Sequence, residues 1–257
     1  MSFKLRNWLP KFLRVPLWGD RERWGLSVVA DDPCWKEWQK TYSNFYQKTQ
    51  RAGLGILVND AGYKIMKEID LTGKRVLEIG AGDIRHLQYL QGQPKEYVLA
   101  DISAEMMTIA QKRLQKKKVR CKSILLNRNQ QLPLEDESID VIISFYSLEH
   151  LYPLKPYLDD MYRVLKSQGL LVGAIPAEGG LGWGLGRVCT SRRWLKKNTP
   201  INPDKVICWE HPNFADDIIS ALDKIFVRQK IKLWPFSWLL LIDLNLVIQL
   251  LYIKSTK

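Results

Sequence analysis

The sequence predicts an α/β protein built on a doubly wound, mostly parallel sheet with helices on both faces. Three observations support this fold class. Between residues 74 and 176, short apolar runs alternate with segments of helical periodicity, the pattern of repeated βα units. The first apolar run ends in a glycine turn. The chain has 257 residues, 46% of them hydrophobic and 26% charged, so it can bury a large core without disulfides or metals.

Strands and helices follow one another in order through this region. The predicted strands are short and largely apolar, and the most continuous of them is 139–145, as expected where both faces of a parallel sheet are covered. Ser103 stands where it can cap the second helix. The strands are predicted at 74–80, 97–101, 121–126, 139–145 and 169–175, and the helices at 84–90, 103–115 and 156–165.

After residue 176 the alternation loosens. The glycine-rich stretch 178–186 predicts a loop, 187–197 is basic, and 214–224 predicts a helix. Residues 233–253 have the length of a membrane span but carry Asp243 at their centre, which is costly in a bilayer. We therefore predict two strands, 225–233 and 244–253, joined by a turn, and no transmembrane segment.

The first 73 residues differ in composition from the rest. They hold five of the ten tryptophans, and 36–46 and 55–69 have helical spacing. We expect residues 1–72 to form a helical lid or extension and residues 73–257 to form the main domain. Basic residues and prolines interrupt the first 18 positions, so we expect no secretory signal.

Charge and cysteine usage narrow the class of protein. The net charge of +12 is spread along the chain, with +4 in residues 1–73, +3 in 74–175 and +5 in 176–257, whereas a nucleic-acid-binding tail would concentrate it. The four cysteines form no C-x-x-C pair and the three histidines are scattered, so we expect no metal site. This usage suits a cytoplasmic protein with reduced thiols.

The sharpest motif lies at the end of the first strand. It reads Val76-Leu77-Glu78-Ile79-Gly80-Ala81-Gly82, an acid followed by two glycines that let the backbone approach a ligand closely. Asp101 ends the next strand, 23 residues after Glu78. In a doubly wound sheet an acid at that place can bind the two hydroxyls of a ribose.

Four segments in this order resemble the class I S-adenosylmethionine-dependent methyltransferases: VLEIGAGDIRHL, YVLADIS, LPLEDESIDVIISFYSLEHL and MYRVLKSQGLLVGAIP. The resemblance covers about residues 73–176. It implies a Rossmann-like sheet of seven strands with an antiparallel last strand, and S-adenosylmethionine as cofactor. A dinucleotide dehydrogenase would instead need a glycine where Arg85 stands, and Glu78 would repel its pyrophosphate.

The resemblance also implies a set of cofactor contacts. Glu78 would face the methionine amino group, Asp101 the ribose, and Ile102 the adenine. The glycine turn would contribute backbone, and the end of the fourth strand would border the methionine portion, with core packing as the alternative for Phe145. The residues in these two groups are Gly80, Ala81 and Gly82 in the turn, and Ser144 and Phe145 in the strand.

Two departures from the family pattern stand out. Ile84 occupies the position of a third glycine, so the backbone there is less free. The aspartate that usually contacts the adenine amino group is replaced by a stretch containing Asn127 and Asn129. One of these asparagines must substitute for it, or the contact is lost.

The acceptor should approach at the carboxyl ends of the fourth and fifth strands. Three residues there are candidate catalytic groups: His150, Glu178 and His211. The alternatives are a structural or cofactor-contact role for His150, a solvated loop acid at Glu178 and a helix-entry residue at His211. Tyr42 and Tyr46 could line a lid over the acceptor. Arg187, with Arg192 and Arg193 in the predicted acceptor-side insertion 177–212, could bind an anionic group.

The sequence thus predicts a methyltransferase acting on oxygen or nitrogen of a small polar acceptor, anionic or sugar-bearing, in a biosynthetic pathway. The region after residue 176 loosely resembles bacterial methyltransferases of surface-polysaccharide and other small-molecule pathways. The basic charge also suits contact with a membrane surface. Two alternatives are an RNA or DNA methyltransferase and a non-catalytic binding protein of the same fold. We do not expect a nucleic-acid partner, because no N/D-P-P-Y/F tetrad follows the fourth strand.

Overall fold

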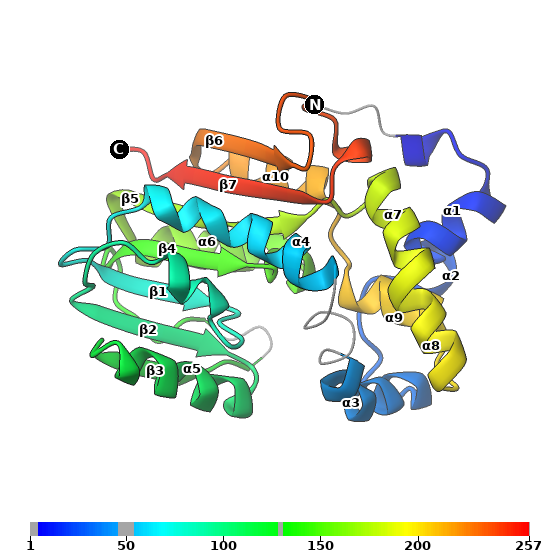
Figure 1. Ribbon diagram of the computed structural model, residues 1–257, viewed down its shortest axis with the longest axis horizontal. Helices are drawn as coiled ribbons and strands as arrows, with labels where there is room; N and C mark the ends of the chain where they lie inside the picture. Colours follow the sequence, from blue (N-terminus) through cyan, green and yellow to red (C-terminus); the bar gives the residue numbers. More distant parts are fainter. Residues whose placement is uncertain (1–4, 46–53, 128–130, 257) are drawn as a thin grey trace.

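The computed structural model describes residues 5–45, 54–127 and 131–256, and its centre is a seven-stranded sheet (Figure 1). The strand order is β3-β2-β1-β4-β5-β7-β6. Only β7 runs antiparallel to its neighbours β5 and β6; the other pairings are parallel. The strands are β1 (Arg75–Ile79), β2 (Glu96–Asp101), β3 (Cys121–Leu125), β4 (Ile139–Phe145), β5 (Leu165–Pro176), β6 (Val227–Trp234) and β7 (Val247–Ile253). This topology confirms the predicted fold class.

Alternate residues of the strands feed two separate cores, one on each face of the sheet. On one face, Leu77 and Ile79 pack with α6 (Leu154–Val164) and α10 (Ala215–Asp223). On the other face, Val76 packs with α5 (Ala104–Lys116) and with the segment that precedes β1. Glu78 lies two residues after Val76 and therefore belongs to this second face, inside the protein.

Most predicted elements appear within a few residues of their expected bounds. Ser103 caps α5 as predicted, its hydroxyl accepting a hydrogen bond from the amide of Met106. The segment expected as a helix at 84–90 is instead a 3-10 helix, η4 (Arg85–Tyr89). The pair β6 and β7 takes up the long apolar stretch near the C-terminus, as expected.

The glycine-rich stretch 178–186 is not the predicted loop, because most of it forms the helix α7 (Leu181–Arg187). This helix packs against α1 (Lys11–Trp18), and Gly184 allows the close approach: a Cβ there would lie 3.1 Å from Leu17 Cβ and Trp18 Nε1. The helix continues through a π-helical turn (Val188–Arg192) into α8 (Arg193–Asn198). Tertiary packing thus overrides the poor helix propensity of glycine.

A group of helices lies beyond the carboxyl ends of the parallel strands, at the right of Figure 1. It combines α1, α2 (Arg21–Trp24) and α3 (Pro33–Phe45) with α7, α8 and α9 (Pro203–Glu210). We call this group the cap. Its core is rich in tryptophan and is made of Trp35, Trp38, Phe45, Leu195, Ile201, Val206, Cys208 and Trp209.

Residues 54–71 do not belong to the cap, although they fall inside the predicted lid 1–72. The helix α4 (Leu54–Tyr63) packs on β5 and β7, and the 3-10 helix η3 (Lys64–Glu68) places Ile65 and Met66 in the sheet core. Gly62 permits this packing, since a Cβ there would lie 2.2 Å from Tyr146 Oη. The division of the chain into functional domains stays a prediction.

Over residues 5–45, 54–127 and 131–256, no helix is both long enough and apolar enough to cross a bilayer.

Candidate cofactor and acceptor site

The glycine turn after β1 is held in one shape by the acid that ends β2. One carboxylate oxygen of Asp101 accepts a hydrogen bond from the Gly82 amide at 2.9 Å, and the other from the Ser103 amide at 2.8 Å. Asp101 is 8% exposed. Each of its oxygens accepts one of these two hydrogen bonds, which leaves a second lone pair on each oxygen. The carboxylate can therefore hold the turn and accept from two further hydroxyl donors.

Both glycines of the turn have positive φ, which favours glycine. At Gly80 (φ +67°) a Cβ would lie 2.4 Å from the Cβ of Ser147. At Gly82 (φ +52°) it would meet no described atom within 4 Å, apart from its chain neighbours. Gly80 thus brings the loop after β4 against the turn, whereas Gly82 borders open space. Ala81 between them is buried.

Ile84, at the position of the family's third glycine, keeps a glycine-like backbone. Its φ and ψ are 44° and 49°, in the left-handed region that is strained for a β-branched residue. Its side chain is buried in the core. The turn therefore combines a left-handed backbone at this position with a buried apolar side chain.

Glu78 lies inside the protein in a chain of polar contacts. Tyr97 Oη donates to its carboxylate at 2.5 Å, and His86 Nε2 lies 3.1 Å from the same hydroxyl. Burial raises the pKa of the Glu78 carboxyl well above its usual range and lowers that of His86 to about 3. Glu78 is 1% exposed. Its expected contact with a methionine amino group stays a prediction.

Two residues expected near the adenine lie on the surface beside Asp101. Ile102 is 69% exposed, unusual for an isoleucine and suited to a face that stacks on a flat ring. Asn127 is exposed just after β3, the strand that pairs with β2. Asn129 lies outside the described residues. The adenine contacts of Ile102 and Asn127 stay predictions.

At the end of β4, Ser144 and Phe145 are both buried. The Ser144 hydroxyl lies 2.5 Å from that of Ser147, which in turn donates to the Ile79 carbonyl at 3.0 Å. The Phe145 ring packs edge-on against Tyr63, with 5.1 Å between ring centroids. These contacts are those of the core-packing alternative, and a cofactor contact for either residue stays a prediction.

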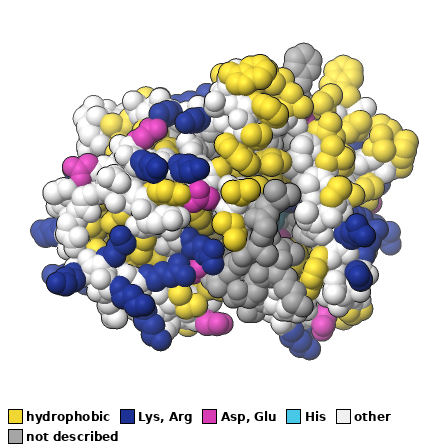
Figure 2. Space-filling view, viewed as in Figure 1, with side chains coloured by type: hydrophobic (Ala, Val, Ile, Leu, Met, Phe, Trp, Pro, Cys, Tyr) yellow, Lys and Arg dark blue, Asp and Glu magenta, His cyan; other side chains and the backbone are white. Residues whose placement is uncertain are grey.

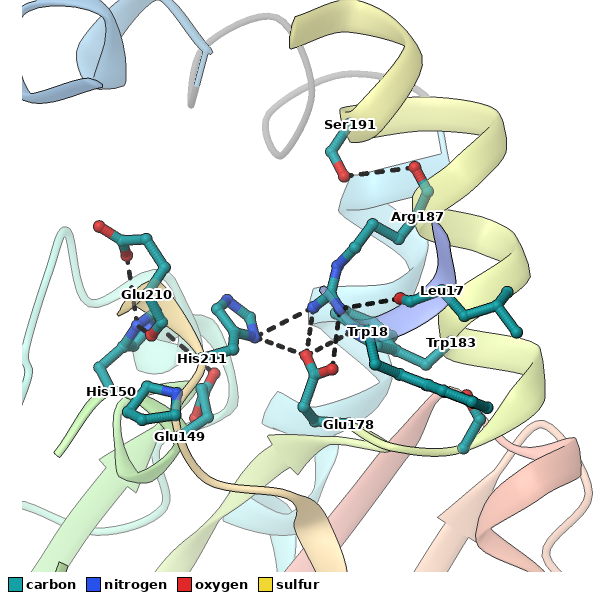
Figure 3. A network of polar contacts seen from close by, with 12 residues as sticks. Leu17, Trp18, Glu149, His150, Glu178, Trp183, Arg187, Ser191, Glu210 and His211 are labelled. Carbon is teal, nitrogen blue, oxygen red and sulfur yellow. Dashed lines mark hydrogen bonds and ion pairs between the residues drawn. The ribbon is translucent and has the colours of Figure 1, made fainter. Parts of the chain in front are cut away.

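A cluster of ionisable groups lies where β4 and β5 end and the cap begins (Figure 3). Its centre is Glu178, which is fully buried. Both terminal nitrogens of the Arg187 guanidinium group donate to its carboxylate. Trp183 Nε1 donates to it at 3.0 Å and His211 Nδ1 at 2.7 Å. Burial alone would raise the pKa of Glu178, but the charge of Arg187 and the bond from His211 hold it well below its ordinary value.

Glu178 thus orients its neighbours: three of its four hydrogen-bond donors lie on Oε2 and one on Oε1. A carboxylate whose pKa is held low binds a proton weakly, and the role of Glu178 as a candidate base stays a prediction. Arg187 is likewise committed, being 7% exposed with both terminal nitrogens on Glu178. Its predicted contact with an anionic acceptor stays a prediction, and the donors that the contact needs are engaged here.

His211 is oriented by Glu178. Ionised Glu178 can only accept, so the Nδ1 of His211 carries the hydrogen and Nε2 keeps its lone pair. Burial, opposed by Glu178 but aided by the charges of His150 and Arg187, lowers the pKa of His211 to about 4. The ring is thus neutral at pH 7.

His150 has the opposite character. Its Nδ1 donates to the Glu210 carbonyl and lies 3.4 Å from the Glu210 carboxylate. Burial lowers the pKa of His150, but Glu210 and the charge of Glu149 outweigh it and raise the value to about 9. These interactions favour the protonated ring, and the role of His150 as a candidate base stays a prediction. Trp38 Nε1 donates to Glu210 at 2.5 Å and ties this pair to the cap.

Glu149 is the residue that the sequence reasoning missed. It is 2% exposed, and its Oε2 has no hydrogen-bond partner within the described residues. Burial raises the pKa of Glu149 to about 7. Its place beside His150 was visible in the sequence, but its unpartnered oxygen emerges only from the fold.

Residues 77–173 match a family of domains described as methyltransferase domain. These residues belong to the sheet described above, whose seven-stranded order and antiparallel β7 are those that the resemblance implies. This is a class I S-adenosylmethionine-dependent methyltransferase domain. The expected cofactor of the domain, S-adenosylmethionine, is confirmed at the level of the family.

Individual relatives agree with this assignment. A probable S-adenosylmethionine-dependent methyltransferase of Mycobacterium tuberculosis is 26% identical over 51% of this chain and 42% of its own length. A ubiquinone/menaquinone biosynthesis C-methyltransferase of Erwinia tasmaniensis is 33% identical over 39% of this chain and 41% of its own. The chain spans about half or less of the length of the curated relatives it matches.

The solved structures show the same fold. A protein of Pyrococcus horikoshii superposes with a TM-score of 0.55 at 15% identity, covering 84% of this chain and 99% of its own. At this identity the likeness concerns the fold alone.

The residues of the methyltransferase domain fit its cofactor at the ribose end. Asp101 offers two oxygens with spare lone pairs, Gly82 borders open space, and Ile102 presents an exposed apolar face beside them. Within the described residues, no group of three or more His, Cys, Asp or Glu side chains could hold a metal ion. Tyr42 is 37% exposed and packs edge-on against Trp38 in the cap, and Tyr46 lies outside the described residues.

Proposed function

We propose that the protein transfers the methyl group of S-adenosylmethionine to an oxygen or nitrogen of a small polar acceptor in a biosynthetic pathway. The observation that carries the proposal is Glu149, a buried carboxyl with a pKa of about 7 and an unpartnered oxygen. Ser147, two residues earlier, contacts the glycine turn at Gly80. A proton acceptor and the expected cofactor cradle thus share one edge of the sheet.

The cofactor supplies an activated methyl on a sulfonium, so the chain has to position the acceptor and accept its proton. Bound at the glycine turn and Asp101, the cofactor would give its methyl group to the oxygen or nitrogen of the acceptor and leave as the neutral thioether. The proton of the acceptor passes to Glu149 Oε2. A base with a pKa near the working pH is best suited to this task. His211, neutral with Nε2 free, is the second candidate in the cluster.

An anionic or sugar-bearing acceptor is part of the proposal, although two of the three arginines expected to hold it are paired. Arg187 is engaged by Glu178, and Arg192 donates to Asp204 at 2.7 Å. Arg193 is exposed at the start of α8. Transfer to carbon is the second candidate, supported by the name of the Erwinia relative.

Labelled methyl transfer tests the proposed function. The protein is incubated with S-adenosylmethionine labelled in the methyl group and with metabolite, lipid-linked sugar and RNA fractions, side by side. We expect label in a small-molecule fraction, with turnover on the order of 100-fold lower in Glu149→Gln. The matched control Glu135→Gln alters an exposed acid remote from β4's carboxyl end and should keep full turnover.

Each other outcome of that assay contradicts a particular part of the proposal. Label in RNA alone would replace the small acceptor with a nucleic acid. Binding of the cofactor without label in any fraction would favour a binding protein. Full turnover in Glu149→Gln would remove Glu149 as the proton acceptor and leave methyl transfer intact.

A further inference from the structure

Large apolar side chains project from two segments that are distant in the sequence. Trp8 is 85% exposed and Trp238 79%, although tryptophan is usually well covered. Figure 2 shows apolar side chains gathered at the top of the molecule, over the start of the chain and the β6–β7 connection. We call these residues the apolar crest: Trp8, Phe12 and Leu13 from the first segment, and Phe236, Trp238, Leu240 and Leu244 from the second.

The two segments of the crest are held side by side by polar contacts beneath them. The backbone amide of Leu5 donates to the Asp243 carboxylate, which joins the start of the chain to the β6–β7 connection. Arg6 then pairs with Asp216 of α10 at 2.8 Å. Since these contacts are largely buried, the relative placement of the two segments is fixed by the fold.

The crest has the composition of a membrane-interface surface. Tryptophan, phenylalanine and leucine that project from a soluble fold insert at the boundary of headgroups and acyl chains. The two tryptophans stand outward as separate projections, whereas a docking groove for a peptide would cover much of each ring. The ring centroids of Phe236 and Trp238 lie 6.3 Å apart, so the second segment presents a small aromatic pair.

The charge of the chain complements an anionic bilayer. The net charge is +12, and +9 of it lies in residues 1–73 and 176–257, which carry the crest. Lys11 and Arg14 lie on α1 beside Phe12 and Leu13 and are half-exposed, each at the surface in an ion pair with Glu22. Basic residues near a bilayer gain free energy from anionic lipids, and the gain adds to that of apolar insertion.

We propose that the apolar crest docks the protein peripherally on an anionic lipid bilayer. The helix α1 carries Phe12 and Leu13 on its outer side, while Leu17 and Trp18 pack inward against α7, which holds Arg187 of the ionisable cluster. Docking would therefore bring the cap, and with it the proposed acceptor side, to the membrane surface. The inference goes beyond the proposed function, because binding to lipid can be measured without any methyl acceptor.

Cosedimentation with vesicles tests the inference. The full chain is mixed with vesicles of phosphatidylcholine containing a quarter phosphatidylglycerol, and with vesicles of phosphatidylcholine alone. We expect binding to the anionic vesicles, weakened by salt, and at least about tenfold weaker binding in Trp8→Ser/Trp238→Ser. The control Val227→Ser alters an exposed residue at the other end of β6 and should bind as the unaltered chain does.

Two outcomes would overturn the inference. The first is no binding of the unaltered chain to anionic vesicles, or equal binding by the double variant. The second is a dimer in sedimentation velocity that dissociates in the double variant, because the crest would then pair two copies of the chain. Calorimetric binding of S-adenosylmethionine should be the same in the double variant, which separates this failure from a failure of the proposed function.

Discussion

At the scale of single residues, Glu149 makes a prediction about stability that needs no substrate. The ordinary pKa of a glutamate is 4.5, and burial raises that of Glu149 to about 7 in the folded protein. Between these values the folded state holds a proton that the unfolded state has released. The contribution of Glu149 to the free energy of unfolding therefore falls as the pH rises from 4.5 through 7.

Glu149→Gln should abolish this loss, because glutamine does not ionise. Relative to the unaltered chain, we expect the variant to gain about 2–3 kcal/mol of unfolding free energy between pH 5 and pH 8. The measurement is urea unfolding at both pH values. His150, Glu178, Glu210 and Tyr146 interact with this carboxyl and are the same in both proteins. A pH-independent difference between the proteins would mean that Glu149 titrates normally.

The ionisable cluster was only partly predictable from the sequence. The expected position of His150, Glu178 and His211 near the carboxyl ends of β4 and β5 was sufficient to choose them as candidate catalytic residues. Their protonation states depend on partners far along the chain, such as Arg187 for Glu178 and Trp38 for Glu210. Glu149 was overlooked because an acid next to a histidine is unremarkable until the fold buries it without a partner.

At the scale of elements, the glycine turn after β1 combines two separate demands on Gly80. Its φ of +67° is costly for any residue with a Cβ, and that Cβ would overlap Ser147. Gly73 has nearly the same φ, +69°, but a Cβ there would meet no described atom within 4 Å, its chain neighbours aside. Substitutions at Gly73 and Gly80 therefore distinguish the cost of backbone strain alone from the cost of strain together with steric overlap.

Gly73→Ala should destabilise the fold by about 1 kcal/mol, the cost of the left-handed backbone. Gly80→Ala should cost roughly 1–3 kcal/mol more, because the loop after β4 must move. Chemical denaturation of both variants measures the difference. Equal losses in the two would show that this loop yields without cost, and so does not fix the turn.

The helix α7 offers a second matched pair of glycines. Gly186 faces open space, so Gly186→Ala should stabilise the protein by about 0.5–1 kcal/mol through helix propensity. Gly184→Ala gains the same propensity but would crowd Leu17 and Trp18 in α1. We expect it to be neutral or destabilising in thermal unfolding. A gain in Gly184→Ala as large as that in Gly186→Ala would mean that α1 is not tightly packed on α7.

The central strands of the sheet were predictable because each is a mostly apolar segment between turn residues, as in β4. The helix α7 was not, since three glycines among its seven residues favour a loop by local propensity alone. What stabilises it is contact with α1, about 170 residues away in the sequence. The local sequence pattern does not indicate a partner so distant in the chain.

At the scale of the whole molecule, the cap explains where the tryptophans go. Trp35, Trp38 and Trp209 form its core, and Trp18 donates to the Gly180 carbonyl at the start of α7. The sequence indicated only that the N-terminal segment and residues 177–212 both lie outside the sheet. Their joint packing depends on pairings such as α3 with α9, which periodicity does not specify.

The central claim is that S-adenosylmethionine binds at the carboxyl ends of β1 and β2, with its ribose on Asp101. Calorimetric titration of the unaltered chain, Asp101→Ala and Ser103→Ala with S-adenosylmethionine tests it most directly. Ser103→Ala removes the cap of α5 but keeps the amide that bonds Asp101. We expect binding at least about tenfold weaker in Asp101→Ala and within about twofold of normal in Ser103→Ala. An unchanged dissociation constant in Asp101→Ala would contradict the site.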